Sequence, residues 1–269
     1  MFLDEIAQYP SSAARRHIID AYKAGSSGPV IARQYDTSKE TIYNVLRAEG
    51  VDRRRPSEAS RRYQLDVHAF DTITPESAYW VGVLMADGCV RYQPNATLQY
   101  GAAAVDRGHV EAFRDFLKST HPFRCRPPRP TSGFGGSSDY CEIVVPSAVL
   151  VAAVARYGVL PRKSLTAKIV GLEDSVDFWR GAIDGDGYLG EYPEVRVGLV
   201  GSQALVQQFE HYVYRNIAGV RATTRRKGTI FGFSVNSTLA VRLLSLLYAG
   251  TPALARKRDH ARSILDRRS

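Results

Sequence analysis

The sequence predicts an α+β protein in which a small all-α helix-turn-helix segment precedes two related αββαββα halves. Two observations lead to this fold class. Apolar residues keep helical spacing between residues 12 and 50, without the alternation of a strand. From residue 74 onward, the same order of apolar helices and alternating segments occurs twice. We therefore expect a helix-turn-helix domain at 1–52, a basic linker at 53–73, a first half at 74–165 and a second half at 166–269.

Three short helices are predicted in the N-terminal segment. The stretch "SAARRHIIDAYKAG" places Ile18, Ile19 and Tyr22 on one face and stops at Gly25. A second helix, "VIARQYD", follows a Ser-Ser-Gly-Pro turn, and "TSKETIYNVLRAEG" supplies a third. We expect the third helix to begin with a capping box that fits Thr37 and Glu40 better than it fits Ser38 and Thr41.

A helix, a turn and a polar third helix form the helix-turn-helix pattern, and the segment resembles that of resolvase-type and other bacterial DNA-binding domains. The resemblance implies that the exposed face of the third helix enters the major groove of DNA. The residues on that face are Lys39, Tyr43, Asn44 and Arg47. A three-helix packing module with a solvated polar face is the alternative.

The linker "VDRRRPSEASRRYQLD" carries five arginines between residues 53 and 62 and has few apolar anchors. Such a composition predicts an extended segment. Arg53, Arg54 and Arg55 are therefore candidates for a tether that follows DNA phosphates. A solvated charge run is the alternative.

The first half begins with an apolar helix that ends at Asp87 and continues into two strands, with Gly101 in the second. An amphipathic helix, two further strands ("FRCRP" and "YCEIVV") and the apolar helix "SAVLVAAVARYG" complete it.

The second half repeats this order after "FWRGAIDGDGYLG". Its strands include one with Gly198 and the pair "VRATTRR" and "TIFGFSV", and its last helix is "STLAVRLLSLLYAG". Even the exits agree, with "LPRKS" at 160–164 and "LARKR" at 254–258. Two related halves in one chain predict pseudo-twofold symmetry, which suits a roughly twofold partner such as duplex DNA.

The charge balance favours a polyanionic partner. The chain has 36 Lys and Arg against 27 Asp and Glu, a net charge of +9. Its longest apolar run is interrupted by Pro146 and Arg156, so no membrane span is expected. The N-terminus lacks the basic region of a secretory signal.

Cysteine and histidine usage excludes other classes of site. The three cysteines lack C-x-x-C spacing, which argues against a disulfide framework or a zinc site and favours a reducing cytoplasm. The six histidines are scattered, and we expect most of them on the surface.

Small residues one turn apart mark the first helix of each half: Gly82 and Ala86 in one, Gly181 and Gly185 in the other. Glycine inside a helix costs about 1 kcal/mol relative to alanine, and close packing of two helices would offset that cost. If the two helices pack together, Asp87 and Asp186 meet at the same end. Two carboxylates at helix C-termini repel each other and oppose the helix dipoles, and a divalent cation such as Mg²⁺ resolves this conflict. The combination predicts metal-assisted phosphodiester hydrolysis.

The stretches "WVGVLMADG" (80–88) and "WRGAIDGDG" (179–187) resemble the two nine-residue motifs of the LAGLIDADG homing endonucleases, in their single-chain, two-motif form. The first departs at its sixth position, where Met85 replaces the usual acid. The metal-binding acid at the eighth position is Asp in both copies. The resemblance covers roughly residues 74–268 and includes the repeat.

The resemblance implies a saddle of two antiparallel sheets over DNA. Asp87 and Asp186, with backbone carbonyls near Ala86 and Gly185, would hold two or three Mg²⁺ ions over the minor groove, with Mn²⁺ as a substitute. Each half would cut one strand and leave short 3′ overhangs. A lysine is expected near each centre; the candidates are Lys163 and Lys257, with Lys168 as a competitor for the first.

Strand residues that face the saddle would read the DNA. The candidates are Arg91, Gln93, Gln99, Arg196, Arg221, Arg225 and Lys227. For each, a solvated edge charge is the alternative. We expect a cytoplasmic monomer of a bacterial or phage-infected cell that cuts a long, asymmetric double-stranded DNA site. The alternative is a non-cutting transcription regulator or an RNA-binding intron maturase of the same fold, although the presence of both motif aspartates favours the nuclease.

Overall fold

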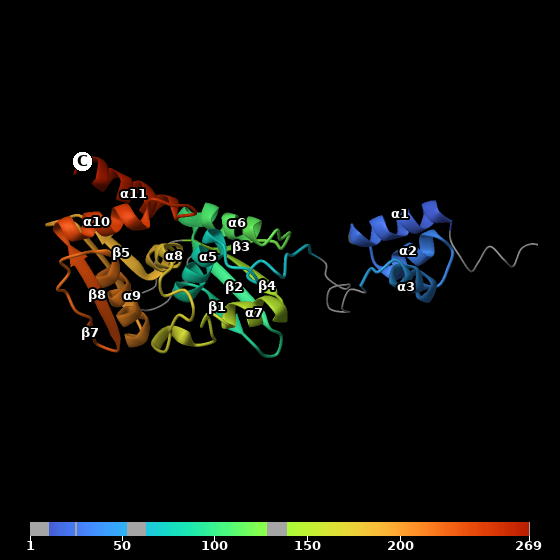
Figure 1. Cartoon of the computed structure of the whole chain (residues 1–269), viewed down its shortest axis with the longest axis horizontal. Helices are drawn as coiled ribbons and strands as arrows, with labels where there is room; N and C mark the ends of the chain where they lie inside the picture. Colours follow the sequence, from blue (N-terminus) through green and yellow to red (C-terminus); the bar gives the residue numbers. More distant parts are fainter. Residues whose placement is uncertain (1–10, 25, 53–62, 128–138, 269) are drawn as a thin grey trace, which may run out of the picture. The chain divides into compact units, whose positions relative to one another are not determined.

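The computed structural model describes residues 11–24, 26–52, 63–127 and 139–268 (Figure 1). The chain divides into two compact units, Met1–Arg62 and Tyr63–Ser269. The candidate phosphate contacts Arg53, Arg54 and Arg55 lie outside the described residues. No helix in the described part is long and apolar enough to span a bilayer.

The described part of the first unit is helical, with α1 (Ser12–Lys23), α2 (Gly28–Gln34) and α3 (Lys39–Ala48). Ile18, Ile31 and Ile42 from these helices are buried together in a small core. The predicted start of α3 is wrong, because Ser38 and not Thr37 caps the helix. The hydroxyl of Ser38 accepts a hydrogen bond from the backbone N–H of Thr41 at 3.1 Å, which satisfies a donor of the first turn.

The second unit begins with a packed segment. Val67 and Phe70 are buried, and the backbone N–H of Asp66 donates to the carbonyl of Leu117 at 2.8 Å. Residues 63–73 of the predicted linker therefore pack on the first half.

The first half has the predicted order αββαββα. Its elements are α5 (Pro75–Ala86), β1 (Cys89–Arg91), β2 (Thr97–Ala103), the 3-10 turn η1 (Ala104–Asp106), α6 (Arg107–Phe116), β3 (Arg124–Arg126), β4 (Tyr140–Pro146) and α7 (Ala148–Ala155). The four strands form an antiparallel sheet in the order β1-β2-β4-β3.

The second half repeats this order after the 3-10 turn η2 (Lys163–Leu165). Its elements are α8 (Val176–Asp186), β5 (Gly187–Gly190), β6 (Arg196–Gly201), α9 (Gln203–Asn216), β7 (Arg225–Lys227), β8 (Ile230–Asn236) and α10 (Ser237–Leu247), followed by a further helix, α11 (Ala255–Asp266). Its antiparallel sheet has the matching order β5-β6-β8-β7. The predicted α+β fold class is confirmed.

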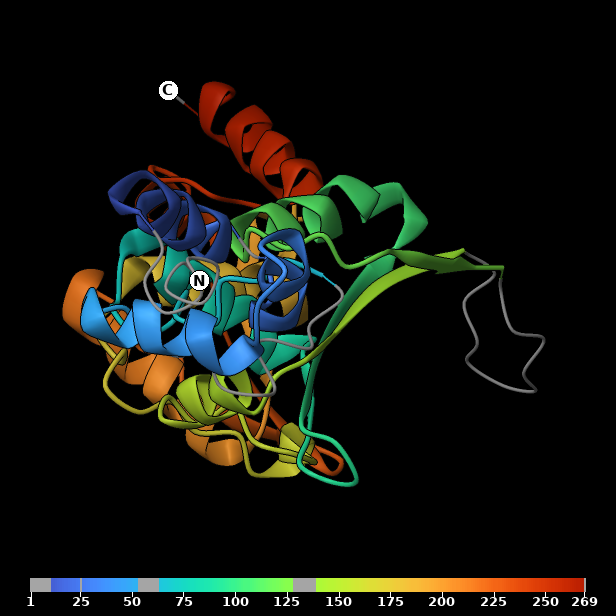
Figure 2. The same cartoon turned by 90° about the vertical axis from the view of Figure 1, so that its right-hand side faces the viewer.

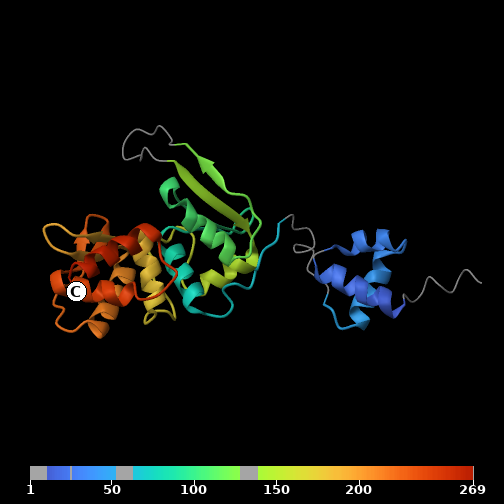
Figure 3. The same cartoon turned by 90° about the horizontal axis from the view of Figure 1, so that it is seen from above.

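The helices α5 and α8 lie side by side between the two sheets (Figures 1 and 3). A Cβ atom added to Gly82 would lie 2.1 Å from the carbonyl oxygen of Phe178, and one added to Gly181 would lie 2.1 Å from that of Tyr79. The two backbones therefore touch where each helix has its glycine. The predicted packing of the two helices is confirmed.

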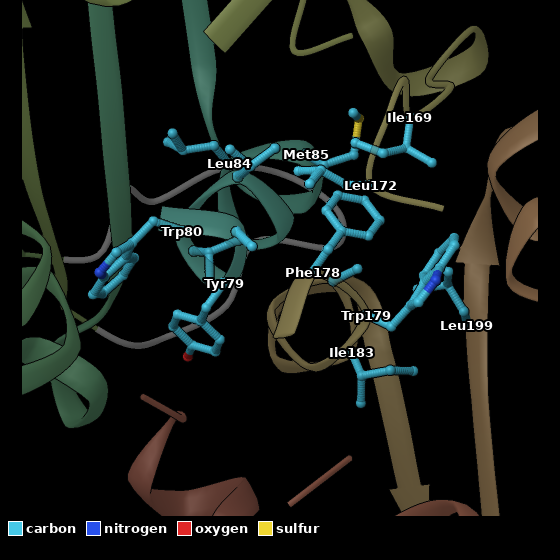
Figure 4. Packing of buried hydrophobic residues seen from close by; sticks show 14 of the residues in the cluster. Tyr79, Trp80, Leu84, Met85, Ile169, Leu172, Phe178, Trp179, Ile183 and Leu199 are labelled. Carbon is cyan, nitrogen blue, oxygen red and sulfur yellow. The ribbon is translucent and has the colours of Figure 1, made fainter. Parts of the chain in front are cut away.

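One apolar core extends across both halves. Trp80 is directed towards the first sheet and Trp179 towards the second (Figure 4). Met85, at the sixth position of the first motif, lies with Ile169, Leu172 and Phe178 in this core (Figure 4).

A disulfide joins Cys125 of β3 to Cys141 of β4, whereas Cys89 is a free, exposed cysteine. The ends of β3 and β4 project from the rest of the second unit (Figure 2). The expectation of no disulfide was wrong, because the spacing of cysteines in the sequence does not show that these two residues are direct cross-strand partners in an antiparallel pair.

Candidate active site

Asp87 is the C-cap of α5, and Asp186 is the last residue of α8, so both stand at the same end of the helix pair. A Cβ atom added to Gly185 would lie 3.1 Å from a carboxylate oxygen of Asp87 and 2.3 Å from the Cβ of Ala86. The side chain of Asp87 therefore lies against the last turn of α8, and glycine at position 185 leaves room for it.

The environment of the two carboxyl groups disfavours their ionised forms. Partial burial, and next the charge of Asp186, raise the pKa of Asp87 to about 6. Partial burial also raises the pKa of Asp186. Asp87 and Asp186 nonetheless keep a large part of their surface accessible, so solvent and substrate can reach them. A bound cation would favour the ionised forms of both carboxyl groups and lower their pKa values.

Two buried lysines lie beneath the ends of these helices. The Nζ atom of Lys163 donates to the carbonyl of Gly88 at 2.5 Å. The Nζ atom of Lys257 donates to the carbonyls of Ile183 and Gly187, at 2.6 Å in both cases. Gly88 and Gly187 stand just past the ends of α5 and α8, so the two ammonium groups place positive charge where the helix dipole favours it. The backbone carbonyl of the glycine after each motif aspartate thus accepts a hydrogen bond from a lysine.

The lysines act on the aspartates in a crossed manner. Lys257 lowers the pKa of Asp87 more strongly than Lys163 does, and Lys163 has the larger effect on that of Asp186. The lysine of each half is therefore coupled more strongly to the aspartate of the other half. Lys168, the competing candidate, is exposed, and the geometry favours Lys163 over it.

The donor set fits a hydrated divalent cation. No cluster of three or more His, Cys, Asp and Glu side chains suited to a metal occurs in the described ranges. The site instead offers the carboxylates of Asp87 and Asp186 and the backbone carbonyls of the last helical turns, to which Ala86 and Gly185 belong. Mg²⁺ is commonly held by one or two carboxylates, with water and phosphate oxygens completing its shell.

A buried polar cluster lies next to the aspartates. Asp184 accepts hydrogen bonds from Tyr79 at 2.8 Å, from Tyr248 at 2.7 Å and from the backbone N–H of Leu254 at 2.6 Å. Burial raises the pKa of Asp184, and these hydrogen bonds oppose that shift. This acid occupies the position that corresponds to Met85 in the first motif.

His109 extends the cluster. Its two ring nitrogens lie within hydrogen-bonding distance of the hydroxyl groups of Tyr79 and Tyr100. Burial lowers its pKa to about 4, so the ring is neutral at pH 7. Four of the six histidines are exposed or partly exposed, as expected, whereas His109 and His121 are buried.

A pocket of about 270 Å³ opens beside Asp87. It is lined by the end of β2, by His109 and Asp184, and by the first turn of α11 through Arg256. Arg256 donates to the carboxylate of Asp106, with its closest contact at 3.0 Å. The pocket therefore joins the first half to α11 of the second.

The open face of the first sheet carries polar residues. Gln99 of β2 pairs with Cys89 of β1, and cross-strand partners lie on the same face of a sheet. Arg91 follows Cys89 by two residues, so Arg91 and Gln99 share this face. Glu142, paired across the strands with Arg124, is buried on this face and accepts hydrogen bonds from Gln99 and Arg126. Glu142 was not predicted from the sequence, because its strand reads as apolar and a single acid within it carries no signal.

The open face of the second sheet is more basic. Arg225 and Lys227 of β7 lie opposite Gly232 and Ile230 of β8, and the Lys227 ammonium group lies 5.7 Å from the centre of the Tyr188 ring. Arg196 donates to the side chain of Asn236 at 3.1 Å. Cross-strand pairing puts all three predicted basic residues on one face.

The remaining candidates do not lie on strands. Gln93 is in the turn between β1 and β2, and Arg221 precedes β7. On α3, Lys39, Asn44 and Arg47 are exposed, whereas Tyr43 is half-buried against the small core. These placements stay compatible with DNA binding.

Comparisons with known proteins find similarity in structure. No protein-family model matches the sequence, and no curated protein matches it. The structure of the LAGLIDADG meganuclease I-AabMI bound to uncleaved DNA is 14% identical; the match covers 73% of this chain and 91% of that chain, with a TM-score of 0.49. The structure of I-CpaMI bound to uncleaved DNA is 10% identical; the match covers 72% of this chain and 92% of that chain, with a TM-score of 0.48. The structure of I-DmoI in complex with DNA and Ca is 15% identical; the match covers 74% of this chain and 99% of that chain, with a TM-score of 0.47. The chain is similar to these proteins in fold, at low sequence identity.

Proposed function

We propose that this chain is a LAGLIDADG endonuclease that makes a staggered double-strand cut in DNA, across the minor groove, in a reaction that depends on Mg²⁺. The observation that carries the proposal is the meeting of Asp87 and Asp186 at one end of a glycine-packed helix pair, with a buried lysine beneath each helix end. No structural role accounts for this arrangement, because it places two like charges where both helix dipoles oppose them.

The proposed chemistry assigns a role to each of the four side chains. Asp87 and Asp186 would bind two or three divalent cations in their ionised forms, with Mn²⁺ as a substitute for Mg²⁺. When bound, such cations supply Lewis-acid stabilisation of charge on the scissile phosphate. Lys163 and Lys257 bind the carbonyls of the glycines that follow the two aspartates, Gly88 and Gly187, and would offset the charge of the carboxylates. The two halves would each cut one strand.

Basic residues on the two open sheet faces support a long, asymmetric target site. Arg91 and Gln99 in the first half and Arg196, Arg225 and Lys227 in the second would contact bases and phosphates. The α1–α3 unit would add a helix-turn-helix contact through α3. We propose a monomer that acts in the cytoplasm of a bacterial or phage-infected cell, since one chain already contains both halves.

The test is selection of cleaved sites from a random double-stranded DNA library in the presence of Mg²⁺, with EDTA as the control. We expect one family of cut sites, absent in EDTA. Asp87→Asn and Asp186→Asn should each reduce double-strand cleavage by at least about 100-fold and leave DNA binding within about threefold. Undiminished cutting by both variants would refute the assignment of the site.

A non-cutting DNA regulator or RNA maturase of the same fold is the second candidate, favoured by the small helical unit. Selection of a bound DNA or RNA sequence without any cut would support it. Because both motif aspartates are present and exposed, the nuclease remains our proposal.

A further inference from the structure

The segments that carry the two lysines are held differently. Lys257 stands in the first turn of α11, and the residues just before it are fixed by two contacts from other parts of the unit. Asp184 accepts a hydrogen bond from the backbone N–H of Leu254 at 2.6 Å, and Asp106 pairs with Arg256 at 3.0 Å. These contacts fix the start of α11 from two sides.

The acid that makes the first of these contacts is itself fixed. Tyr79 of the first half and Tyr248 of the second both donate to the carboxylate of Asp184, which is buried. Each of its oxygens has a partner, so its rotamer is fully determined. The segment 254–257 is thereby tied to the central helix α8.

The corresponding segment of the first half lacks these contacts. Met85 stands where Asp184 does and has no polar group to offer. Leu160 is 46% exposed, whereas its counterpart Leu254 is 6% exposed. No ion pair to Arg162, the counterpart of Arg256, is found among the described residues. The carbonyl of Lys163 accepts hydrogen bonds from the backbone N–H groups of Thr166 and Ala167, and Ser202 donates to the carbonyl of Ala167.

The lysines differ accordingly. Lys257 reaches the carbonyls of Ile183 and Gly187 at 2.6 Å and that of Gly185 at 3.4 Å. Lys163 donates to the carbonyl of Gly88 alone in the described part of the chain. The ammonium group of Lys257 is thus held in place before any substrate binds, and catalytic groups held in this way act faster because less ordering remains.

We infer that Asp184, with Tyr79 and Tyr248, is a positioning residue for Lys257 and that the two strand-cutting centres are unequal, the one served by Lys257 cutting first. Asp106 and Arg256 contribute to the same positioning. The inference rests on the proposed nuclease function, because it concerns the order of its two cuts.

The test measures the rate of each nick separately on a target labelled on both strands. Lys257→Met first identifies the strand that this lysine serves, as the strand that is slowed more. In the wild type, that strand should be nicked first. Asp184→Asn should slow the same strand about tenfold and the other less than about twofold, because the lysine is displaced and not removed.

Two variants separate positioning from general loss of structure. Asp106→Asn should slow the strand served by Lys257 about threefold, since a partly exposed ion pair adds less than a buried hydrogen bond. Arg162→Ala, at the position that corresponds to Arg256, should leave the strand served by Lys163 unchanged. A lesion that only loosens the fold would slow both strands equally, and that result would overturn the inference.

Hydrogen exchange supplies a readout that needs no cutting. Asp184→Asn should accelerate exchange of the amides of residues 254–258 and leave those of 163–167 unchanged. If wild-type protein cuts no DNA, the proposed function fails, and unchanged exchange at 254–258 in Asp184→Asn would separately refute the positioning role.

Discussion

The two halves of the second unit share a backbone plan but differ at the sixth motif position. In the second half Asp184 is hydrogen-bonded to Tyr79, whereas in the first half Met85 lies in the core near Phe178, the counterpart of Tyr79 (Figure 4). A polar pair on one side of the pseudo-twofold axis has thus been exchanged for an apolar pair on the other. Because Met85 points into the core, its presence removes no ligand from the aspartate pair.

The contrast between the halves shows which features must be equal in both. The glycines at the helix contact, the aspartates and a buried lysine recur at matching positions in both halves, whereas the contacts that hold each lysine differ. We conclude that geometry at the axis constrains both halves alike, whereas packing around it can vary in matched pairs. Substitutions at matched positions of the two halves test this conclusion.

The largest effect is expected at the shared helix contact. Gly82→Ala and Gly181→Ala should each destabilise the second unit by at least about 3 kcal/mol, because the new Cβ would overlap a carbonyl oxygen. The effects should be similar in the two halves. Thermal or urea unfolding measures them, and Gly108→Ala is the matched control. Nothing lies within 4 Å of a Cβ at that helical position, so that change should stabilise the protein by up to about 1 kcal/mol.

The matched pairs can be exchanged. Met85→Asp alone should cost about 3 kcal/mol, since it buries a carboxylate among apolar side chains. Adding Phe178→Tyr should recover part of this loss, because the new hydroxyl would stand to the introduced carboxylate as Tyr79 stands to Asp184. Met85→Leu should cost less than about 1.5 kcal/mol. The free energies of unfolding of the wild type, of Met85→Asp, of Phe178→Tyr and of the double variant form a double-mutant cycle. Strict additivity of the two changes would show that the two positions are independent.

The raised pKa of Asp87 predicts how the stability of the second unit depends on pH. The pKa of Asp87 is raised from 3.8 to about 6, so the protonated group's contribution to stability is present below 3.8 and is lost as the pH rises through about 6. In metal-free buffer, Asp87→Asn should therefore raise Tm at pH 7, and its advantage should shrink as the pH falls to about 5. Added Mg²⁺ should stabilise the wild type more than the variant. A Tm advantage that grows on acidification would contradict the sign of the shift.

The smallest effect concerns the sheet faces, which differ by one buried acid. Glu142 neutralises Arg126 in the first half, whereas Gly232 occupies the equivalent position beside Lys227 in the second. Glu142→Gln should increase affinity for random DNA about threefold and steepen its salt dependence by about one ion, because it frees a cation for phosphate contacts.

The control for the acid on the sheet face is Glu111→Gln. Glu111 also binds an arginine, Arg107, but on α6. That change should alter DNA affinity less than Glu142→Gln does. Equal effects of the two variants would show that only net charge matters, and that the position of Glu142 on the sheet face does not.

Local patterns in the chain were enough to predict the repeat and the approach of α5 to α8. These patterns are apolar periodicity, turns and small residues one helical turn apart. They also singled out Asp87 and Asp186, because two acids at equivalent helix ends conflict with local rules unless they share a task.

Contacts between residues far apart in the chain became visible only in the folded protein. The Cys125–Cys141 disulfide, the burial of Glu142 and the link from Asp184 to Leu254 join residues whose spacing in the chain carries no periodic signal. Sequence patterns report how one element presents its side chains, whereas these features arise where two elements meet. The difference between the two lysine segments could therefore be seen only after the halves were folded together.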